Sequence, residues 1–433
     1  MLLTVSCSPY KYETVKGDPL ETKIYTLNNG LKVYMSVNEE APRIKANIVV
    51  KVGGKNDPSE TTGLAHYFEH LMFKGTEQFG TSDYAAEKPL LDQIESLFEV
   101  YRTTTDEAER AALYHKIDSI SYLASDYFIP NEYDKLMSFI GSEGTNAYTS
   151  TDRKSTREDI PSNQIENWAK IQADRFSNAV IRGFHTELET VYEEKNMSLT
   201  RDFEKALETI DGILFPDHPY GTQTVLGTQE HLKNPSIINI KNYYKKYYVP
   251  NNMAICVSGD FNPDEMVAII EKYFGRMQPN EDLSELTLKT EFQLEAPVEK
   301  EVYGLDAEAI IMGWKYPGAA SKDALIAEVA ASVLYNGAAG LIDLNINQEQ
   351  KVLGASGMSY PRPDASELII MAYPKQGQSL EEVRDIMLEE VAKLRNGEFD
   401  EELLAGTVNN LRLAQMKSLE SNASRADMFV NSF

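Results

Sequence analysis

Two histidines and a glutamate lie close together near the start of the chain, within the segment Thr62-Gly-Leu-Ala-His-Tyr-Phe-Glu-His-Leu-Met-Phe-Lys-Gly-Thr76. On a helix, which turns by about 100° per residue, His66, Glu69 and His70 share one stripe. Imidazoles at positions i and i+4 converge on one metal ion, and an open tetrahedral zinc site then needs one more protein ligand and a water. Glu69 is placed to accept a proton from that water. The order H-x-x-E-H inverts the H-E-x-x-H order of zinc-binding helices.

The opposite side of this helix is apolar and suited to packing against a core. Its members are Leu64, Tyr67, Phe68, Leu71 and Met72. The alternative interpretation is an amphipathic helix whose polar side carries two histidines by coincidence, because short motifs have a known false-positive rate. With only six histidines in 433 residues, such spacing beside a glutamate is uncommon, and the sequence favours a metal site.

Further motifs follow along the chain. They are Asn29-Gly-Leu-Lys-Val-Tyr34, Phe73-Lys-Gly-Thr76, Asn146-Ala-Tyr-Thr-Ser150, Val191-Tyr-Glu-Glu194, Asp217-His-Pro-Tyr-Gly221 and Val257-Ser-Gly-Asp-Phe261. Together with His66 to His70, this series resembles the pitrilysin and insulysin type of zinc metallopeptidase, a family that includes the mitochondrial processing peptidases. The resemblance extends from about Leu27 to the end of the chain. It implies Zn²⁺ as cofactor, peptides or unfolded polypeptides as substrates, and Glu69 as the general base.

The stretch 82–139 is long, charged and favours helices. Family members pass from the metal helix to the Asn-Ala-Tyr-Thr-Ser motif in far fewer residues, so this stretch resembles an inserted helical hairpin. Counting the family's usual spacing from His70 reaches Glu143 to Asn146, which belong to that later motif. Allowing for the insertion moves the expected third ligand to the segment Glu187–Asn196.

On a helix over that segment, Glu187, Val191 and Glu194 share one stripe, whereas Glu193 points to a different side and meets solvent. By resemblance, Glu194 is the third zinc ligand and Glu187 is the acidic residue that supports the site. A charged carboxylate buried without a metal would be unfavourable. The alternative for Glu194 is a surface acid in a charged helix, and His185 is a weaker candidate ligand.

The segment from Asn146 reads as a strand that ends in polar residues. An exposed sheet edge can pair with an extended peptide through main-chain hydrogen bonds. By resemblance, Asn146 and Ala147 are the substrate-binding positions. An ordinary hairpin strand is the alternative interpretation.

The strand and helix patterns predict an α+β fold. Alternating residues from Lys23 to Met35, interrupted by Asn28-Asn-Gly30, predict a hairpin, and 44–52 predicts a third strand before the metal helix. The acidic segment 278–297 predicts a linker. Beyond it the chain repeats its plan without H-x-x-E-H, with strands near Val302 and Ile310 and a helix over 323–334.

We therefore expect two homologous domains, each a mostly antiparallel sheet covered by helices. Residues 21–277 would form a zinc-binding peptidase domain, and 298–433 a second repeat domain that binds no metal. That repeat is short and resembles a C-terminally incomplete copy. Family enzymes usually close two such two-domain halves around the substrate, so we expect a second half, in a longer chain or a partner subunit.

Residues 1–20 resemble the end of a lipoprotein signal followed by a tether, with Cys7 as a candidate lipid anchor; a disordered N-terminus with an unpaired thiol is the alternative. The lipoprotein interpretation predicts a bacterial cell envelope protein, membrane-anchored and facing the periplasm or the surface. The formal net charge of −25 argues against a nucleic-acid partner. The sequence contains no run of about 18 apolar residues, so we expect no membrane-spanning helix.

The function expected from these observations is a zinc-dependent endopeptidase. Two other classes remain open at this point. One is a noncatalytic peptide-binding or structural subunit of a peptidase-like complex. The other is a surface lipoprotein that binds a nutrient or partner and retains a vestigial metal site.

Overall fold

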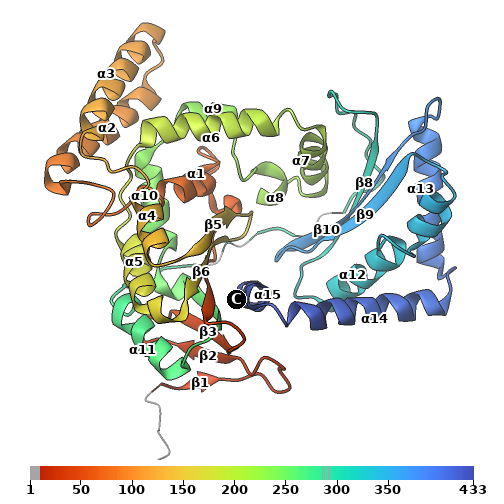
Figure 1. Cartoon of the computed structure of the whole chain (residues 1–433). Helices are drawn as coiled ribbons and strands as arrows, with labels where there is room; N and C mark the ends of the chain where they lie inside the picture. The colour runs from red at the N-terminus through yellow and green to blue at the C-terminus, as the bar shows by residue number, and fades with distance from the viewer. Residues whose placement is uncertain (1–9, 285, 287, 291–292) are drawn as a thin grey trace, which may run out of the picture. The chain divides into compact units, whose positions relative to one another are not determined.

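A computed structural model describes residues 10–284, 286, 288–290 and 293–433 (Figure 1). The chain divides into two compact units. Unit 1 comprises the chain up to Lys195 together with 223–285 and 418–433, and unit 2 comprises 196–222 and 286–417. The candidate lipid anchor Cys7 lies outside the described residues.

Unit 1 is built on a seven-stranded sheet. In spatial order its strands are β1 (Tyr12–Glu13), β2 (Lys23–Thr26), β3 (Lys32–Val37), β7 (Met253–Gly259), β4 (Arg43–Val50), β6 (Lys154–Pro161) and β5 (Glu143–Thr149). Only β3 and β7 run parallel among these neighbours. Gly30 adopts a φ of +87° in the turn between β2 and β3, as the Asn-Asn-Gly signal predicts. Strand β5 forms one edge of the sheet.

Both faces of this sheet are covered, and β4 shows how. Ile44 and Ile48 join the main core cluster, to which α5 (Ile165–Ser177) and α11 (Pro263–Phe274) contribute Trp168 and Met266. Val49 points to the other face and joins Phe429 of α15 (Asn422–Ser432). Alternate side chains of a strand point to opposite faces, so a strand that is apolar along its length fits a sheet buried on both sides.

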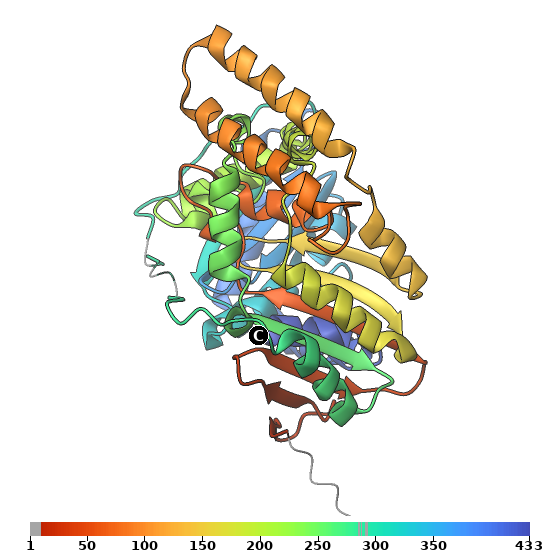
Figure 2. The ribbon, with the colours of Figure 1, turned by 90° about the vertical axis from the view of Figure 1, so that its left-hand side faces the viewer.

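Unit 1 contains seven further α-helices among its described residues. They are α1 (Leu64–Leu71), α2 (Tyr84–Thr103), α3 (Glu107–Ser125), α4 (Glu132–Phe139), α6 (Phe184–Ser198), α9 (Gln229–Lys233) and α10 (Ile237–Tyr247). Helices α2 and α3 pack together as a long hairpin within the stretch predicted to be inserted, as Figures 1 and 2 show. Asp83 and Asp106 cap them by accepting hydrogen bonds from backbone N–H groups of the first turn.

Unit 2 contains a three-stranded antiparallel sheet in the order β8 (Ile310–Pro317), β10 (Ala365–Tyr373), β9 (Gly354–Tyr360). Its helices are α7 (Asp202–Leu214), α8 (Pro219–Thr222), α12 (Lys322–Leu334), α13 (Leu380–Asn396) and α14 (Glu401–Ser418), with a short π-helix at Asp343–Gln348. The helix predicted over 323–334 is confirmed. The prediction of a strand near Val302 is wrong, because Val302 is exposed and lies in a segment without regular structure.

The two units differ from the predicted domain ranges at two places. Residues 196–222, predicted within the first domain, belong to unit 2, where Leu214 packs against Ala365 and Asp211 pairs with Arg362. Residues 418–433, predicted within the second domain, belong to unit 1, where Phe429 covers the sheet. Both segments are placed by contacts with residues far away in the sequence.

The predicted α+β class, with mostly antiparallel sheets, is confirmed. In the residues that the structure describes, no helix combines the length and the apolar character needed to cross a bilayer.

Candidate metal centre

The helix α1, which carries the H-x-x-E-H motif, is fixed at its start by Asp57. Its buried carboxylate accepts hydrogen bonds from the backbone N–H groups of Gly63, Leu64 and Ala65 at 2.8, 3.0 and 3.0 Å. These groups have no partner inside the helix. Gly63 has a φ of +87°, and a Cβ there would lie 2.7 Å from the carbonyl oxygen of Leu226, so glycine alone fits. The start of α1, and with it the direction of its polar stripe, is thereby determined.

Two helices bring three potential metal ligands together. His66 and His70 project from α1, and Glu194 projects from α6. The Oε2 atom of Glu194 lies 2.9 Å from Nε2 of His66 and 3.5 Å from Nε2 of His70. One ligand atom from each of the three side chains lies within 4.8 Å of the other two. The structure therefore brings together the three residues that the sequence predicts as ligands.

The far side of His70 is held by Glu187, which lies about two turns before Glu194 on the same stripe of α6. The Nδ1 atom of His70 lies 2.7 Å from Oε1 of Glu187, and Lys74 forms an ion pair with the same carboxylate. Burial favours the neutral acid, but the hydrogen bonds from His70 and Lys74 outweigh it and hold the pKa of Glu187 below its usual value. The ionised carboxylate fixes the ring of His70 so that its Nε2 faces Glu194.

Glu69 is buried beside this cluster, with 8% of its surface exposed. The hydroxyl of Thr149 donates a hydrogen bond to its Oε2 atom. Thr149 is the last residue of β5, so the edge strand contacts the predicted general base directly. Thr149 belongs to the Asn-Ala-Tyr-Thr-Ser motif, but no local sequence pattern pairs it with Glu69.

The predicted substrate-binding residues lie on β5. Asn146 is exposed and Ala147 half-buried, and both pair with β6. The side chain of Asn146 accepts a hydrogen bond from the backbone N–H of Ala147 at 2.8 Å. Because β5 forms a sheet edge, its other side can pair with an added strand.

Lys154 lies opposite Thr149 on β6 and was not predicted from the sequence. Its side chain is 1% exposed, with Nζ 2.9 Å from Sδ of Met72 and 5.8 Å from the ring centre of Phe68. Burial lowers the pKa of Lys154 to about 7, although the negative charge of Glu69 acts in the opposite direction. A lysine in an alternating polar strand is typical of a surface, so the pattern carried no signal of this burial.

The other histidines do not join the cluster. His115 is exposed, His218 accepts a hydrogen bond from the backbone N–H of Tyr220, and His231 accepts one from the backbone N–H of Thr62. His185 lies near Asp118 of α3. Among the described residues it does not belong to the cluster of His66, His70 and Glu194, so it is not the third ligand of that cluster. Glu193 is exposed, as predicted.

Two sequence profiles match the chain. Residues 32–90 match the profile described as insulinase (peptidase family M16), and residues 238–411 match the profile described as the peptidase M16 inactive domain. The chain belongs to peptidase family M16. The first match includes the metal-motif helix and ends inside the stretch predicted to be inserted. The second match begins in α10 of unit 1 and ends in α14 of unit 2, and the H-x-x-E-H motif of this M16 chain lies outside it.

Curated relatives agree with this assignment. The M16 chain is 22% identical to zinc protease PqqE of Helicobacter pylori over 420 residues, which cover 94% of the chain and 82% of that protein. It is 21% identical to the mitochondrial-processing peptidase subunit beta of Neurospora crassa over 285 residues, which cover 63% of the chain and 47% of that subunit. The chain thus spans less than half of this second relative.

Solved structures show the same fold. A protease from Helicobacter pylori superimposes with a TM-score of 0.75 at 20% identity, covering 98% of the M16 chain and 89% of its own. The first half of the periplasmic protease PqqL from Escherichia coli superimposes with a TM-score of 0.66 at 15% identity, covering 97% and 82%.

Proposed function

We propose that this chain is a zinc-dependent endopeptidase that hydrolyses peptides or unfolded polypeptides, with His66, His70 and Glu194 as zinc ligands and Glu69 as general base. The observation that carries the proposal is the convergence of those three ligand atoms, from two helices, beside a buried carboxylate. Relatives named zinc proteases support the metal and the reaction class.

The donor set suits zinc. Two imidazole nitrogens and one carboxylate oxygen, with a position left for water, form a known type of catalytic zinc site. The hydrogen bond from His70 to Glu187 supplies the outer contact that metal-bound histidines normally make. Calcium or magnesium would instead favour a site made of oxygen ligands alone.

The residues around the ligands account for the chemistry. His66, His70 and Glu194 would hold a zinc ion, which would supply Lewis-acid polarisation of the scissile carbonyl and a water of lowered pKa. Glu69 accepts the proton of the attacking water and delivers it to the leaving amine. Thr149 holds one carboxylate oxygen of Glu69 and leaves the other for this transfer. Strand β5 pairs with the extended substrate at Asn146 and Ala147, which gives affinity without a strict sequence requirement.

We extend the proposal to assembly and location. The chain would act as one of two halves that enclose the substrate, supported by its likeness to the first half of PqqL. We expect it in the bacterial cell envelope as a lipoprotein anchored through Cys7 and facing the periplasm or the surface. The likeness to PqqL, described as periplasmic, supports this expectation.

Zinc content and peptide cleavage measured on the same samples test the function. The wild type and Glu69→Gln should both bind one zinc ion per chain, but only the wild type should cleave an unfolded polypeptide. Glu194→Gln should lose the zinc, whereas the matched change Glu193→Gln on the neighbouring exposed position should retain both zinc and activity.

Each cleavage assay is run with the chain alone and with its natural continuation or partner half. If both the wild type and Glu69→Gln bind zinc but neither cleaves in either form, the noncatalytic peptide-binding or structural role replaces the peptidase proposal.

A further inference from the structure

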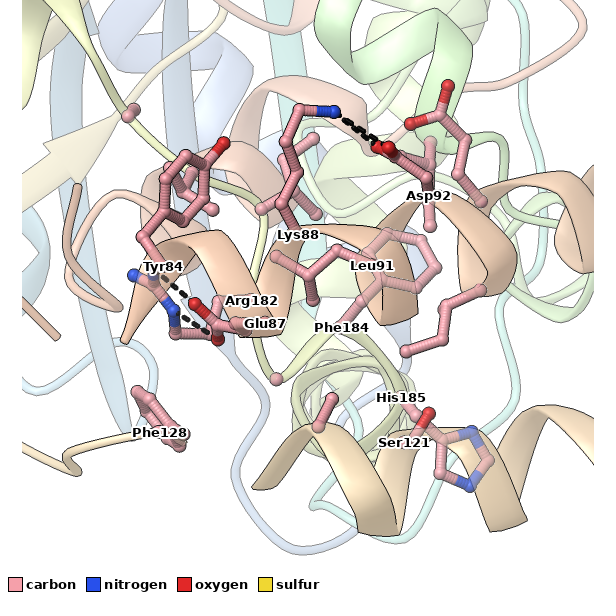
Figure 3. Close-up of a pocket in the computed structure, with 18 of the residues that line it drawn as sticks. Tyr84, Glu87, Lys88, Leu91, Asp92, Ser121, Phe128, Arg182, Phe184 and His185 are labelled. Atoms are coloured by element: carbon pink, nitrogen blue, oxygen red, sulfur yellow. Dashed lines mark hydrogen bonds and ion pairs between the residues drawn. The ribbon is translucent and has the colours of Figure 1, made fainter. Parts of the chain in front are cut away.

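A second candidate site lies in unit 1, away from the metal ligands. A cavity of about 520 Å³ is enclosed by the α2–α3 hairpin, residues 177–183, the first turn of α6 and one side of α10 (Figure 3). Its lining residues include neither histidine of α1 nor Glu194. Cavities of this volume are typical of small-molecule sites.

Much of the cavity wall is apolar. Its apolar lining residues include Leu91, Ile94, Phe128, Phe184 and Tyr244. Phe184 is held firmly, since its ring lies 4.8 Å from that of Phe98 and its carbonyl oxygen accepts a hydrogen bond from Tyr67. An apolar group of a ligand therefore meets preformed rings and aliphatic chains.

The positive charges on the wall are already paired. The pairs are Arg182 with Glu87, Lys88 with Asp92, and Lys241 with Glu95. Arg182 and Glu87 are both fully buried, and the guanidinium also donates to two backbone carbonyls. Two more carboxylates, Glu77 and Asp118, line the cavity without a lysine or arginine partner among the described residues. The wall thus favours a cation over an anion.

His185 supplies an observation that points to a ligand directly. The residue is 9% exposed, its Nε2 atom lies 3.5 Å from Oδ1 of Asp118, and its ring packs against Tyr114. Within the described part of the chain, its Nδ1 atom and the buried hydroxyl of Ser121 have no hydrogen-bond partner. Both residues line the cavity. Buried polar atoms are rarely left unpaired, because each loses its hydrogen bonds to water without gaining a partner.

The orientation of His185 determines what kind of group is missing. When Nε2–H points to Asp118, Nδ1 presents a lone pair and requires a hydrogen-bond donor. The hydroxyl of Ser121 and the carboxylate of Asp118 can accept from the same donor group. An ammonium group carries three N–H donors and a positive charge, which matches these acceptors.

We propose that this cavity binds an organic ammonium ion that carries an apolar group. The ammonium contacts His185, Ser121 and Asp118, and the apolar group packs against the apolar side chains that line the cavity. Two sources share this chemistry, namely a small hydrophobic amine and the free N-terminus of a peptide with an apolar first residue.

Calorimetric titration of the full chain tests the site with 4-phenylbutylamine and its neutral analogue 4-phenylbutan-1-ol. We expect saturable binding of the amine and at least about tenfold weaker binding of the alcohol, because the alcohol lacks the positive charge. Asp118→Asn should cause a smaller but measurable loss, since its side chain is 65% exposed and water screens part of its charge. Asp126→Asn, at the exposed end of the same helix, should bind as the wild type does. Ser121→Ala should weaken the amine, whereas Ser119→Ala, on the exposed side of α3, should not.

Competition separates the two sources. If Phe-Ala-amide displaces the amine and its N-acetylated form does not, a peptide N-terminus is the ligand; if neither displaces it, the ligand is a small amine. Equal binding of the amine and the alcohol overturns the proposal. So does wild-type affinity in both Asp118→Asn and Ser121→Ala, or the absence of saturable binding up to about 10 mM amine.

Discussion

The hydroxyl of Thr149 donates a hydrogen bond to the carboxylate of Glu69. This contact joins the edge strand β5 to the metal-motif helix α1, so that the strand expected to hold a peptide also orients the carboxylate expected to accept a proton. The last residue of β5 thus links substrate binding to the proposed chemistry.

Removal of that hydroxyl should impair catalysis without removing the metal. In Thr149→Val, we expect kcat to fall by about 10- to 100-fold, as is typical when an outer hydrogen bond at a metal site is lost, with zinc content unchanged. Thr145→Val is the matched control, since Thr145 lies on the same strand and contacts Ser142 rather than Glu69. Equal kcat in Thr149→Val and the wild type would show that the contact has no part in positioning the base.

Glu187 should determine how tightly the metal is held. We expect Glu187→Gln to lower zinc affinity by about 10- to 100-fold, because the amide no longer fixes the ring of His70 as an anion does. Chelator competition measures this change. Glu189→Gln, on the exposed side of the same helix, should leave the affinity unchanged, and a matching loss there would point to a general effect of charge.

Lys154 should make stability depend on pH. Its folded pKa of about 7 lies below its ordinary value of 10.5, so between these values the unfolded chain binds more protons and the free energy of unfolding rises with pH. Relative to Lys154→Met, the wild type should gain up to about 1.4 kcal/mol per pH unit over this interval. Denaturant unfolding from pH 7 to 10 measures the difference, with the exposed Lys170→Met as control. Parallel pH profiles of the wild type and Lys154→Met would contradict a buried neutral lysine.

The buried pair of Arg182 and Glu87 should hold the helical hairpin to the rest of unit 1. Arg182→Met leaves an uncompensated buried carboxylate and should lower the free energy of unfolding by about 3–5 kcal/mol. The double variant Arg182→Met/Glu87→Leu should recover most of this loss, because it removes both charges. A double variant as unstable as the single one would show that the lost arginine contacts to backbone carbonyls dominate instead.

The sequence predicted the parts of the site that depend on residue type and local spacing. His66, Glu69 and His70 follow from helical periodicity alone, and the turn at Gly30 follows from its residue types. Glu194 required a known family pattern and a correction for the insertion, because no local signal connects two helices separated by more than a hundred residues.

The remaining features depend on contacts between distant segments. Lys154 occupies a polar-looking strand position, and only the packing of α1 against the sheet buries it. Leu214 belongs to unit 2 because it packs against Ala365. Phe429 belongs to unit 1 because it packs on the face of the sheet that carries Val49. An isolated apolar residue such as Val302 suggested a strand, but no neighbouring strand pairs with it among the described residues.

His66, His70 and Glu194 should together bind one zinc ion. Anomalous diffraction at the zinc edge, recorded from crystals of the zinc-loaded protein, locates the ion. We predict a single strong peak about 2.0–2.2 Å from Nε2 of both histidines and from a carboxylate oxygen of Glu194. A peak bound by other residues, or a zinc-loaded crystal with Glu194 turned away from both imidazoles, would contradict the account.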